Sequence, residues 1–229
     1  APGLWQSEAR GLPQTELAAW FDEIWREVQS PESAVVSSVL DARHTRMLEE
    51  WMQQRWSLTP HVVRAQAQLL GVTNRYRDPR SLGADRWAAL IAARQGYRGP
   101  LCVVDCGSAI TVDALSEQGD FLGGAIFPGL ELVRRALLTG TAGVRAAAGD
   151  DSSCFARATA DGVAAGSLYG LAGAIERILE EQRRLLGPDA LVVITGGDAP
   201  TVAARLRVPT ILDPDLVLKG LELIAGELT

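Results

Sequence analysis

The sequence predicts a mixed α/β protein in which part of the sheet is parallel. Strand-like and helix-like segments alternate along the first hundred residues, which is typical of βαβ units. Three apolar segments between residues 101 and 127 are separated by short polar turns, which predicts an antiparallel meander. In a chain of 229 residues, 47% apolar and 22% charged residues indicate one large globular domain or two smaller ones, and exclude an intrinsically disordered chain.

Apolar periodicity predicts the elements of the first hundred residues. Apolar side chains recur at helical spacing over 15–29, where Thr15 can cap the start and Pro31 lies just beyond the end. The other predicted elements are a strand at 34–39, a helix at 44–56, a strand at 61–64, a polar loop through 74–79 and a helix from about 83 to 95.

After residue 100, buried strands alternate with longer helices. The change of texture at Gly99-Pro100 predicts a boundary between one domain at 1–100 and a second at 101–229. The predicted strands of the second part are 101–104, 110–115, 121–127, 191–194 and 208–212, and its helices are 129–138, 158–186, one after 197 and one from about 214.

Charge and residue usage exclude several function classes. The net charge of −6 gives no electrostatic reason to expect DNA or RNA as a partner. Lys219 is the single lysine and stands in Leu-Lys-Gly, so the Gly-Lys-Ser/Thr of a Walker phosphate loop is absent. With three cysteines and two histidines a zinc site is not expected, and Cys102 and Cys106 stand in an apolar run that suits a reducing cytosol.

The chain shows no signal for a membrane or for export. No apolar run approaches about 18 residues without a charge or a glycine cluster, and the first residues do not have the design of a signal peptide. We therefore expect a cytoplasmic protein with no membrane partner.

The segment 105–111 has the features of a phosphate-binding turn. Asp105 closes a strand, and Gly107 permits a tight bend with exposed backbone N–H groups. Ser108 and Thr111 add hydroxyl donors, and the carboxylate can hold a cation that offsets phosphate charge. An ordinary hairpin turn in which Asp105 caps its own backbone has the same pattern. The turn alone leaves both interpretations open.

A second candidate is the glycine pair Gly196-Gly197, which follows a buried strand and precedes a helix. Paired glycines there let a phosphate or a flat ring approach the backbone at the start of a helix. A plain strand–helix connector explains the pair equally simply, and for this motif alone it is the better-supported interpretation.

A third candidate is Gly83-Ala84-Asp85-Arg86, at the start of a predicted helix. Asp85 is a candidate general base, and Arg86 can fork onto a carboxylate or a phosphate. An aspartate in a first helical turn also complements the helix dipole, which is the more common reason for its presence.

A stripe of glycines runs along the long predicted helix at 158–186. A glycine inside a helix costs about 1 kcal/mol relative to alanine, so we infer that another helix approaches closely along the stripe, in a packing seam or a dimer interface. The stripe consists of Gly162, Gly166, Gly170 and Gly173.

Together these segments resemble the type III pantothenate kinases, members of the superfamily of actin, sugar kinases and heat-shock ATPases. The resemblance covers roughly 60–229 and implies two ribonuclease H-like domains of the actin-like ATPase type, with mixed sheets flanked by helices and a cleft between the domains. Ser108 stands where the family usually has threonine. The segments that carry the resemblance are Tyr76, Gly83–Arg86, Asp105–Thr111, Gly123–Gly129, Ala158–Asp161 with Gly166, Thr195–Gly197 and Asp213–Leu221.

The resemblance implies ATP-dependent phosphorylation of pantothenate to 4′-phosphopantothenate, the first step of coenzyme A biosynthesis. Asp85 would accept the proton of the pantothenate hydroxyl, Asp105 would bind a monovalent cation (K⁺ or NH₄⁺), and Mg²⁺ would accompany ATP. Phosphoryl transfer depends mainly on such positioning and charge neutralisation. The implied pantothenate site consists of Tyr76, Gly83, Ala84, Asp85 and Arg86 with Thr159 from the partner of a homodimer, and the implied ATP site of Gly107, Ser108, Thr111, Gly196 and Gly197.

The chain departs from the family at its start. The family opens with a strand and an Asp-x-Gly-Asn-Thr/Ser phosphate turn, and no segment here matches it. Two strands and a turn, about 20 residues, are thus missing, either from the protein or only from the chain printed here. We favour the second alternative, because without this hairpin the N-terminal sheet would have open edges.

Two other functions remain open: an accessory transcriptional regulator on the same scaffold, and another kinase of the superfamily that acts on acyl groups or sugars. The acidic charge and the lack of a basic helix argue against direct DNA contact. A pure scaffold has no need of Asp85. The Gly-x-Asp-Arg motif with its upstream tyrosine argues against an acyl or sugar kinase.

Overall fold

A seven-stranded mixed sheet forms the centre of the protein, so the predicted mixed α/β fold class is confirmed. The computed structural model describes residues 17–38, 41–142, 144 and 149–228. In sheet order the strands are β3 (Gln68–Leu69), β4 (Val72–Asn74), β7 (Asp120–Pro128), β6 (Ala109–Leu115), β5 (Leu101–Cys106), β8 (Leu191–Thr195) and β9 (Ile211–Leu212). The strands β5, β6 and β7 form the predicted antiparallel meander, whereas β8 and β9 run parallel to β5, and β4 runs parallel to β7.

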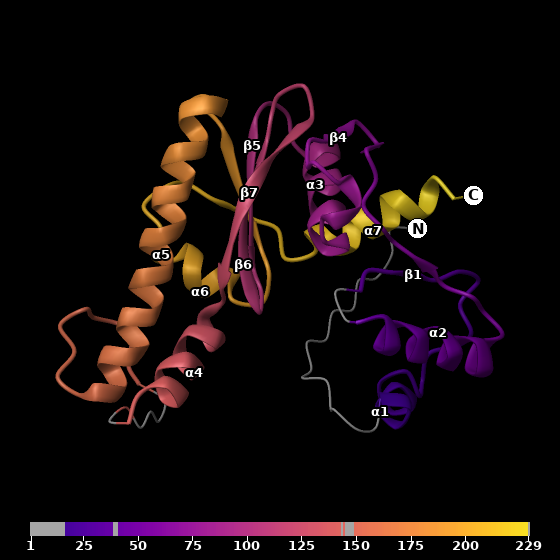
Figure 1. Ribbon diagram of the computed structural model, residues 1–229, viewed down its shortest axis with the longest axis horizontal. Helices are drawn as coiled ribbons and strands as arrows, with labels where there is room; N and C mark the ends of the chain where they lie inside the picture. The colour runs from indigo at the N-terminus through magenta and orange to yellow at the C-terminus, as the bar shows by residue number, and fades with distance from the viewer. Residues whose placement is uncertain (1–16, 39–40, 143, 145–148, 229) are drawn as a thin grey trace.

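Helices cover both faces of this sheet. In chain order the helices are α1 (Leu17–Ile24), α2 (Ala42–Trp56), the short 3₁₀ helix η1 (Pro79–Ser81), α3 (Ala84–Gly96), α4 (Leu130–Gly140), α5 (Thr159–Leu186), α6 (Ala199–Ala203) and α7 (Leu216–Gly226). Figure 1 shows α4, α5 and α6 on one face and α3 with α7 on the other. None of the helices in the described part of the chain is long and apolar enough to cross a membrane.

The first two helices lie beside the sheet, with a small parallel sheet of β1 (Val35–Val36) and β2 (His61–Val62) (Figure 1). Asp41 caps α2, because its carboxylate accepts hydrogen bonds from the backbone N–H groups of Arg43 and His44. Between α1 and α2 the aromatic rings of Phe21 and Trp51 pack with their centroids 5.6 Å apart. This pair of helices therefore has an apolar cluster of its own.

Alternation along β5 divides the apolar interior into two cores. Leu101 and Val103 pack in the core beneath α3, and Cys102 and Val104 pack in the core beneath α5. Successive side chains of a strand point to opposite faces. Asp105, the next residue of β5, therefore belongs to the face that α3 covers.

Helix α3 is held between the sheet and α7. Trp87 and Leu90 of α3 are fully buried, and Leu216 and Ile224 of α7 pack in the same core. The strands β3 and β4 and helix α3, which all precede residue 100, lie in or against the same sheet as the strands that follow it. The domain boundary near residue 100 stays a prediction.

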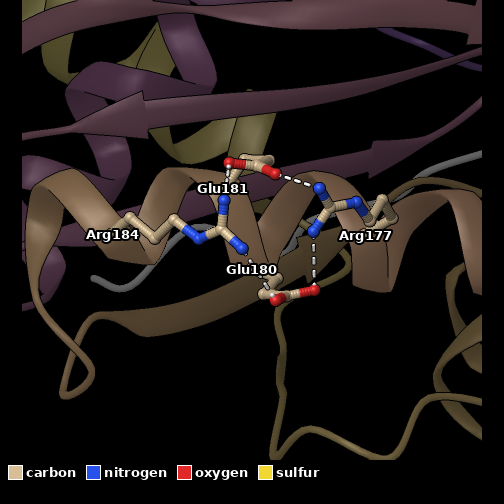
Figure 2. A network of polar contacts seen from close by, with 4 residues as sticks. All are labelled: Arg177, Glu180, Glu181 and Arg184. Carbon is tan, nitrogen blue, oxygen red and sulfur yellow. Dashed lines mark hydrogen bonds and ion pairs between the residues drawn. The ribbon is translucent and has the colours of Figure 1, made fainter.

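The end of α5 carries an exposed ionic network (Figure 2). Arg177 pairs with Glu180 at 2.8 Å and with Glu181, and Arg184 pairs with the same two carboxylates at 3.2 and 2.7 Å. These side chains are between 46% and 60% exposed, so water screens the charges and the network adds little to stability.

Several predicted elements are wrong in their extent. The helix predicted at 15–29 ends at Ile24, and Thr15 lies outside the described residues. The strands predicted at 34–39, 61–64 and 208–212 are each only two residues long: β1 pairs with β2, and β9 pairs with two residues of β8.

The polar loop predicted through 74–79 is also wrong at its start, where Asn74 ends β4. The strands β3 and β4 are short, and the partner of β4 lies at residues 120 and 121, far along the chain. Local periodicity carries no signal of such distant pairing.

Candidate active site

Asp105 lies at the end of β5, between Thr111 of β6 and Thr195 of β8. Burial, and after it the negative charges of Asp85 and Asp113, raise the pKa of Asp105 to about 6. Its carboxylate has no hydrogen-bond or ion-pair partner among the described residues. A cation beside Asp105 would therefore find a carboxylate without a competing partner.

Asp85 lies in the first turn of α3 and extends toward the same region. The helix begins here because the N–H of Trp87 donates to the carbonyl oxygen of Gly83 at 2.9 Å, and Asp85 Oδ1 accepts the N–H of Arg86 at 2.7 Å. The charge of Asp85 raises the pKa of both Asp105 and Asp113. Three carboxylates, from α3, β5 and β6, thus lie within electrostatic reach of one another.

The guanidinium of Arg86 forks onto the carboxylate of Asp113. Arg86 Nε donates to Asp113 Oδ2 at 2.9 Å, Nη2 donates to Oδ1, and Nη1 donates to the hydroxyl oxygen of Tyr76 at 3.0 Å. The two charged residues are only 6% and 1% exposed. The fork that the sequence assigns to a substrate carboxylate or phosphate is therefore held by a carboxylate of the protein itself.

The two charges of this buried pair affect each other's protonation. Burial would lower the pKa of Arg86, but the hydrogen bonds and charge of Asp113 outweigh burial and raise it. Burial raises the pKa of Asp113, while Arg86 and the hydroxyl of Thr111 oppose that rise. Thr111, predicted to contact ATP, is buried, and its hydroxyl bonds to Asp113.

The bend between β5 and β6 leaves one backbone donor free. The N–H of Gly107 donates to the carbonyl oxygen of Ala109 at 3.2 Å, so this group is already used. Ser108 is exposed, and its N–H has no partner in the described part of the chain. The N–H of Asp198 donates to the carbonyl oxygen of Cys106 at 3.0 Å, which ties the bend to the turn before α6.

That second turn contains the predicted pair Gly196-Gly197. Gly196 has φ +97°, and a Cβ added to it would lie 2.5 Å from Asp105 Oδ1. Only glycine fits both the backbone conformation and the space. The N–H of Gly197 has no partner within the described ranges, and a Cβ there would meet open space.

These groups fit an anion together with a cation. The free N–H groups of Ser108 and Gly197 and the Ser108 hydroxyl are phosphate donors, and Asp105 is the nearby carboxylate. No group of three or more His, Cys, Asp or Glu side chains among the described residues is arranged to hold a metal ion by itself. The backbone donors and the Ser108 hydroxyl therefore suit a phosphate group.

A cavity of about 640 Å³ lies between α2, β2 and the start of α3. Gly83 and Ala84, both predicted to form the substrate site, are part of its wall. Three arginines and a single glutamate give the wall a net positive charge. These four are Arg46, Arg64, Arg80 and Glu49.

Thr159 is not brought into this region. It is exposed at the first position of α5, and α5 covers the face of the sheet opposite to α3 (Figure 1). Within one chain, Thr159 and Asp85 therefore lie on opposite sides of the sheet.

Asp113 is the residue of the site that sequence reasoning missed. The signal was present, because a charged residue stands in the middle of an otherwise apolar strand, and a buried charge needs a partner. Its partner Arg86 lies 27 positions earlier in the sequence, which no local pattern relates to it.

Two solved structures share this fold. A protein from Campylobacter jejuni that carries the name of a Baf family transcriptional activator superposes with a TM-score of 0.60 at 21% identity, over 90% of this chain and 87% of that one. A protein from Sinorhizobium meliloti named as a 2-dehydro-3-deoxygalactonokinase superposes with a TM-score of 0.54 at 14% identity, over 94% and 86% of the two chains. Likeness at these identities shows the fold alone.

Sequence comparison goes further. The type III pantothenate kinase of Alkalilimnicola ehrlichii is 40% identical over an alignment of 235 positions, gaps included, which covers 98% of this chain and 93% of the relative. That of Nitrosococcus oceani is 36% identical over 220 residues, which cover 93% and 83% of the two chains. The family model described as type III pantothenate kinase matches residues 5–181. The chain belongs to the type III pantothenate kinase family.

Proposed function

We propose that this protein transfers the γ-phosphoryl group of ATP to the hydroxyl of pantothenate, producing 4′-phosphopantothenate for coenzyme A biosynthesis in the cytoplasm. The substrate follows from family membership and from the names of the relatives. The observation that carries the proposal is the approach of Asp85, at the start of α3, to Asp105, at the end of β5.

Asp85 accepts the proton of the substrate hydroxyl. A general base must reach the attacking group, and Asp85 makes no ion pair among the described residues that would hold it elsewhere. One Asp85 oxygen accepts the N–H of Arg86, which fixes the carboxylate and leaves its other oxygen for the hydroxyl.

The bend that contains Asp105 and Ser108 holds the phosphates. The backbone N–H groups of Ser108 and Gly197 donate to phosphate oxygens, and Asp105 faces a monovalent cation such as K⁺ or NH₄⁺. When bound, this cation and the Mg²⁺ of the nucleotide neutralise phosphate charge. The free donors and the unpartnered carboxylate described above support these assignments.

The cavity at Gly83-Ala84 receives the body of pantothenate. Its volume lies within the range of small-molecule sites. Pantothenate is a carboxylate, and the excess of arginine in the wall suits an anion.

A homodimer completes the site with Thr159 of the partner. Gly166, Gly170 and Gly173 have no neighbouring atom within 4 Å of an added Cβ, so no part of the described chain fills the stripe along α5. Large apolar side chains exposed on β7, α4 and α5 support a second copy there. They are Leu122, Ile126, Leu132 and Tyr169.

Asp85→Asn tests the proposed base. We expect kcat for pantothenate-dependent ADP release to fall about 10²–10⁴-fold, with little change in the unfolding midpoint, because the amide retains the shape but cannot take the proton. Asp189→Asn is the matched control, since Asp189 is exposed and precedes β8, at the end of the strand away from the site. Full activity of Asp85→Asn would remove Asp85 from the role of base.

The rival function, an accessory transcriptional regulator, predicts a different result. It requires specific, salt-sensitive binding of DNA by this chain or its complex, which a gel shift measures. The unpartnered carboxylate at Asp105 and the free backbone donors around it favour the kinase.

A further inference from the structure

The Arg86–Asp113 pair is an unusual feature of the α3 face. Both charges are buried beside an apolar core, where the cost of removing ions from water often exceeds the gain from pairing them. Replacing a buried ion pair by apolar residues of similar volume is often neutral or even stabilising. A buried pair that is no better for stability needs another reason, and its third contact, with Tyr76, supplies one.

The sheet is shaped to hold Asp113 in place. Asp113 pairs across the strands with Gly124 of β7, and a Cβ added to Gly124 would overlap the Asp113 carboxylate and the Val112 carbonyl oxygen. The glycine leaves the space that the Asp113 carboxylate occupies. The carboxylate therefore meets Arg86 with both oxygens.

This arrangement decides what the Tyr76 hydroxyl can do. Arg86 Nη1 donates to the hydroxyl oxygen, so the hydroxyl acts as an acceptor toward Arg86 and its own proton points elsewhere. No acceptor for that proton exists among the described residues. The Tyr76 ring itself is held 5.1 Å from Phe121, and its backbone N–H donates to Asn74 Oδ1 at 3.1 Å.

We propose that Asp113 is a positioning residue for substrate binding. Its carboxylate accepts hydrogen bonds from Nε and Nη2 of Arg86, which directs Nη1 to the Tyr76 hydroxyl oxygen. The Tyr76 O–H proton is thereby turned toward an acceptor oxygen of the substrate. This inference rests on the proposed function, in which Tyr76 belongs to the pantothenate site. Asp113 itself does not contact the substrate.

A double-mutant cycle between Asp113 and Tyr76 tests the proposal. We expect Tyr76→Phe and Asp113→Asn each to raise KM for pantothenate about tenfold, with a smaller effect on kcat, as the loss of one hydrogen bond does. The double variant should show no further rise, because Asp113 acts through the hydroxyl that Tyr76→Phe removes. A merely structural role would multiply the two effects.

Asp120→Asn is the matched control. Asp120 also pairs with an arginine, Arg75, but on the exposed side of β7 and without contact to Tyr76. We expect it to leave KM unchanged. If Tyr76→Phe alone leaves KM unchanged, both the proposed site and this inference are wrong. If Tyr76→Phe raises KM and Asp113→Asn does not, only this inference is wrong.

The charge left on Arg86 by Asp113→Asn can prevent folding. For that case Arg86→Met with Asp113→Leu removes both charges and keeps the volume. We expect this variant to fold and to show the same rise in KM, with no addition from Tyr76→Phe. A wild-type KM in this variant would overturn the proposal.

Discussion

The two faces of the central sheet come from the same strands but carry different chemistry. In β5 and β6, Cys106 and Val112 turn toward α5 into a dry apolar core, whereas Asp105 and Asp113 turn toward α3. The thiols on the α5 face show how apolar that side is, because burial raises the pKa of Cys102 to about 11. The comparison shows that the apolar α5 face stabilises the sheet. The α3 face instead keeps buried carboxylates close to one another, at a cost in stability.

The largest change in activity should come from combining Asp85 of one subunit with Thr159 of the other in a mixed dimer. Asp85→Asn and Thr159→Ala are each expected to impair every site of their own homodimer. After mixing and subunit exchange, about a quarter of all sites should combine an intact Asp85 with an intact Thr159 of the partner. Pantothenate kinase activity at low substrate should then exceed the sum of the two separate preparations.

The matched control for this experiment is Asp85→Asn mixed with a second variant that carries both substitutions. In that mixture no site combines the two intact residues. Activity that stays at the sum of the parents in the test mixture, despite proven exchange, would contradict a site shared between subunits.

The next effect concerns the apolar face alone. Ile175 of α5 is fully buried in the core beneath α5, and Ile175→Ala should lower the free energy of unfolding by about 3 kcal/mol because it leaves a cavity. At saturating substrates kcat per folded molecule should stay unchanged. Urea unfolding and initial rates measure the two quantities, and Ile175→Val, which should cost about 1 kcal/mol, is the control. A large loss of kcat would show that the two faces are coupled.

The smallest expected change is in the pH dependence of stability and comes from Asp105 on the polar face. Because Asp105 has a pKa of about 6 when folded and 3.8 as its ordinary value, the folded state binds the proton more tightly. Between these two pKa values the wild-type protein loses stability as pH rises. Above about pH 6 the full cost of keeping the ionised carboxylate buried lowers the free energy of unfolding. Asp105→Asn should therefore raise the free energy of unfolding by about 1–3 kcal/mol at pH 7, without cations or ATP.

This gain should shrink as the pH falls from 6 and disappear below 3.8, where the wild-type carboxyl is protonated in both states. The same variant should lose kinase activity and its dependence on K⁺. Unfolding midpoints measured across this pH range check the first expectation. If the difference in stability between the variant and the wild type does not vary with pH, Asp105 does not have a raised pKa in the folded state.

Sequence reasoning reached those parts of the structure that local patterns determine. The apolar run 101–104 and the turn after Asp105 predicted the meander, and the position of Asp85 in a first helical turn is confirmed. The chain alone could not supply pairings between distant segments. The edge strand β4 exists only because β7 offers it a neighbour, and Arg86 has its partner in another element.

The site shows the same division. Asp85 and Asp105 were singled out by type and spacing, and in the structure burial and then the charge of Asp85 raise the pKa of Asp105. The sequence pattern could not predict that the N–H of Gly107 is unavailable to a ligand. This N–H donates to the carbonyl oxygen of Ala109, so the N–H of Ser108 is the free donor of the bend. Which donor in a bend is free depends on its tertiary hydrogen bonds rather than on its sequence pattern.

The packing of α7 against α3 has a consequence for biosynthesis. A ribosome releases residues in chain order, so α7 emerges after α3, the meander and α5. Until Leu216 and Ile224 arrive, the nascent chain exposes the apolar side of the helix that carries Asp85. This exposed apolar side makes the nascent chain a target for chaperones until α7 has packed against α3.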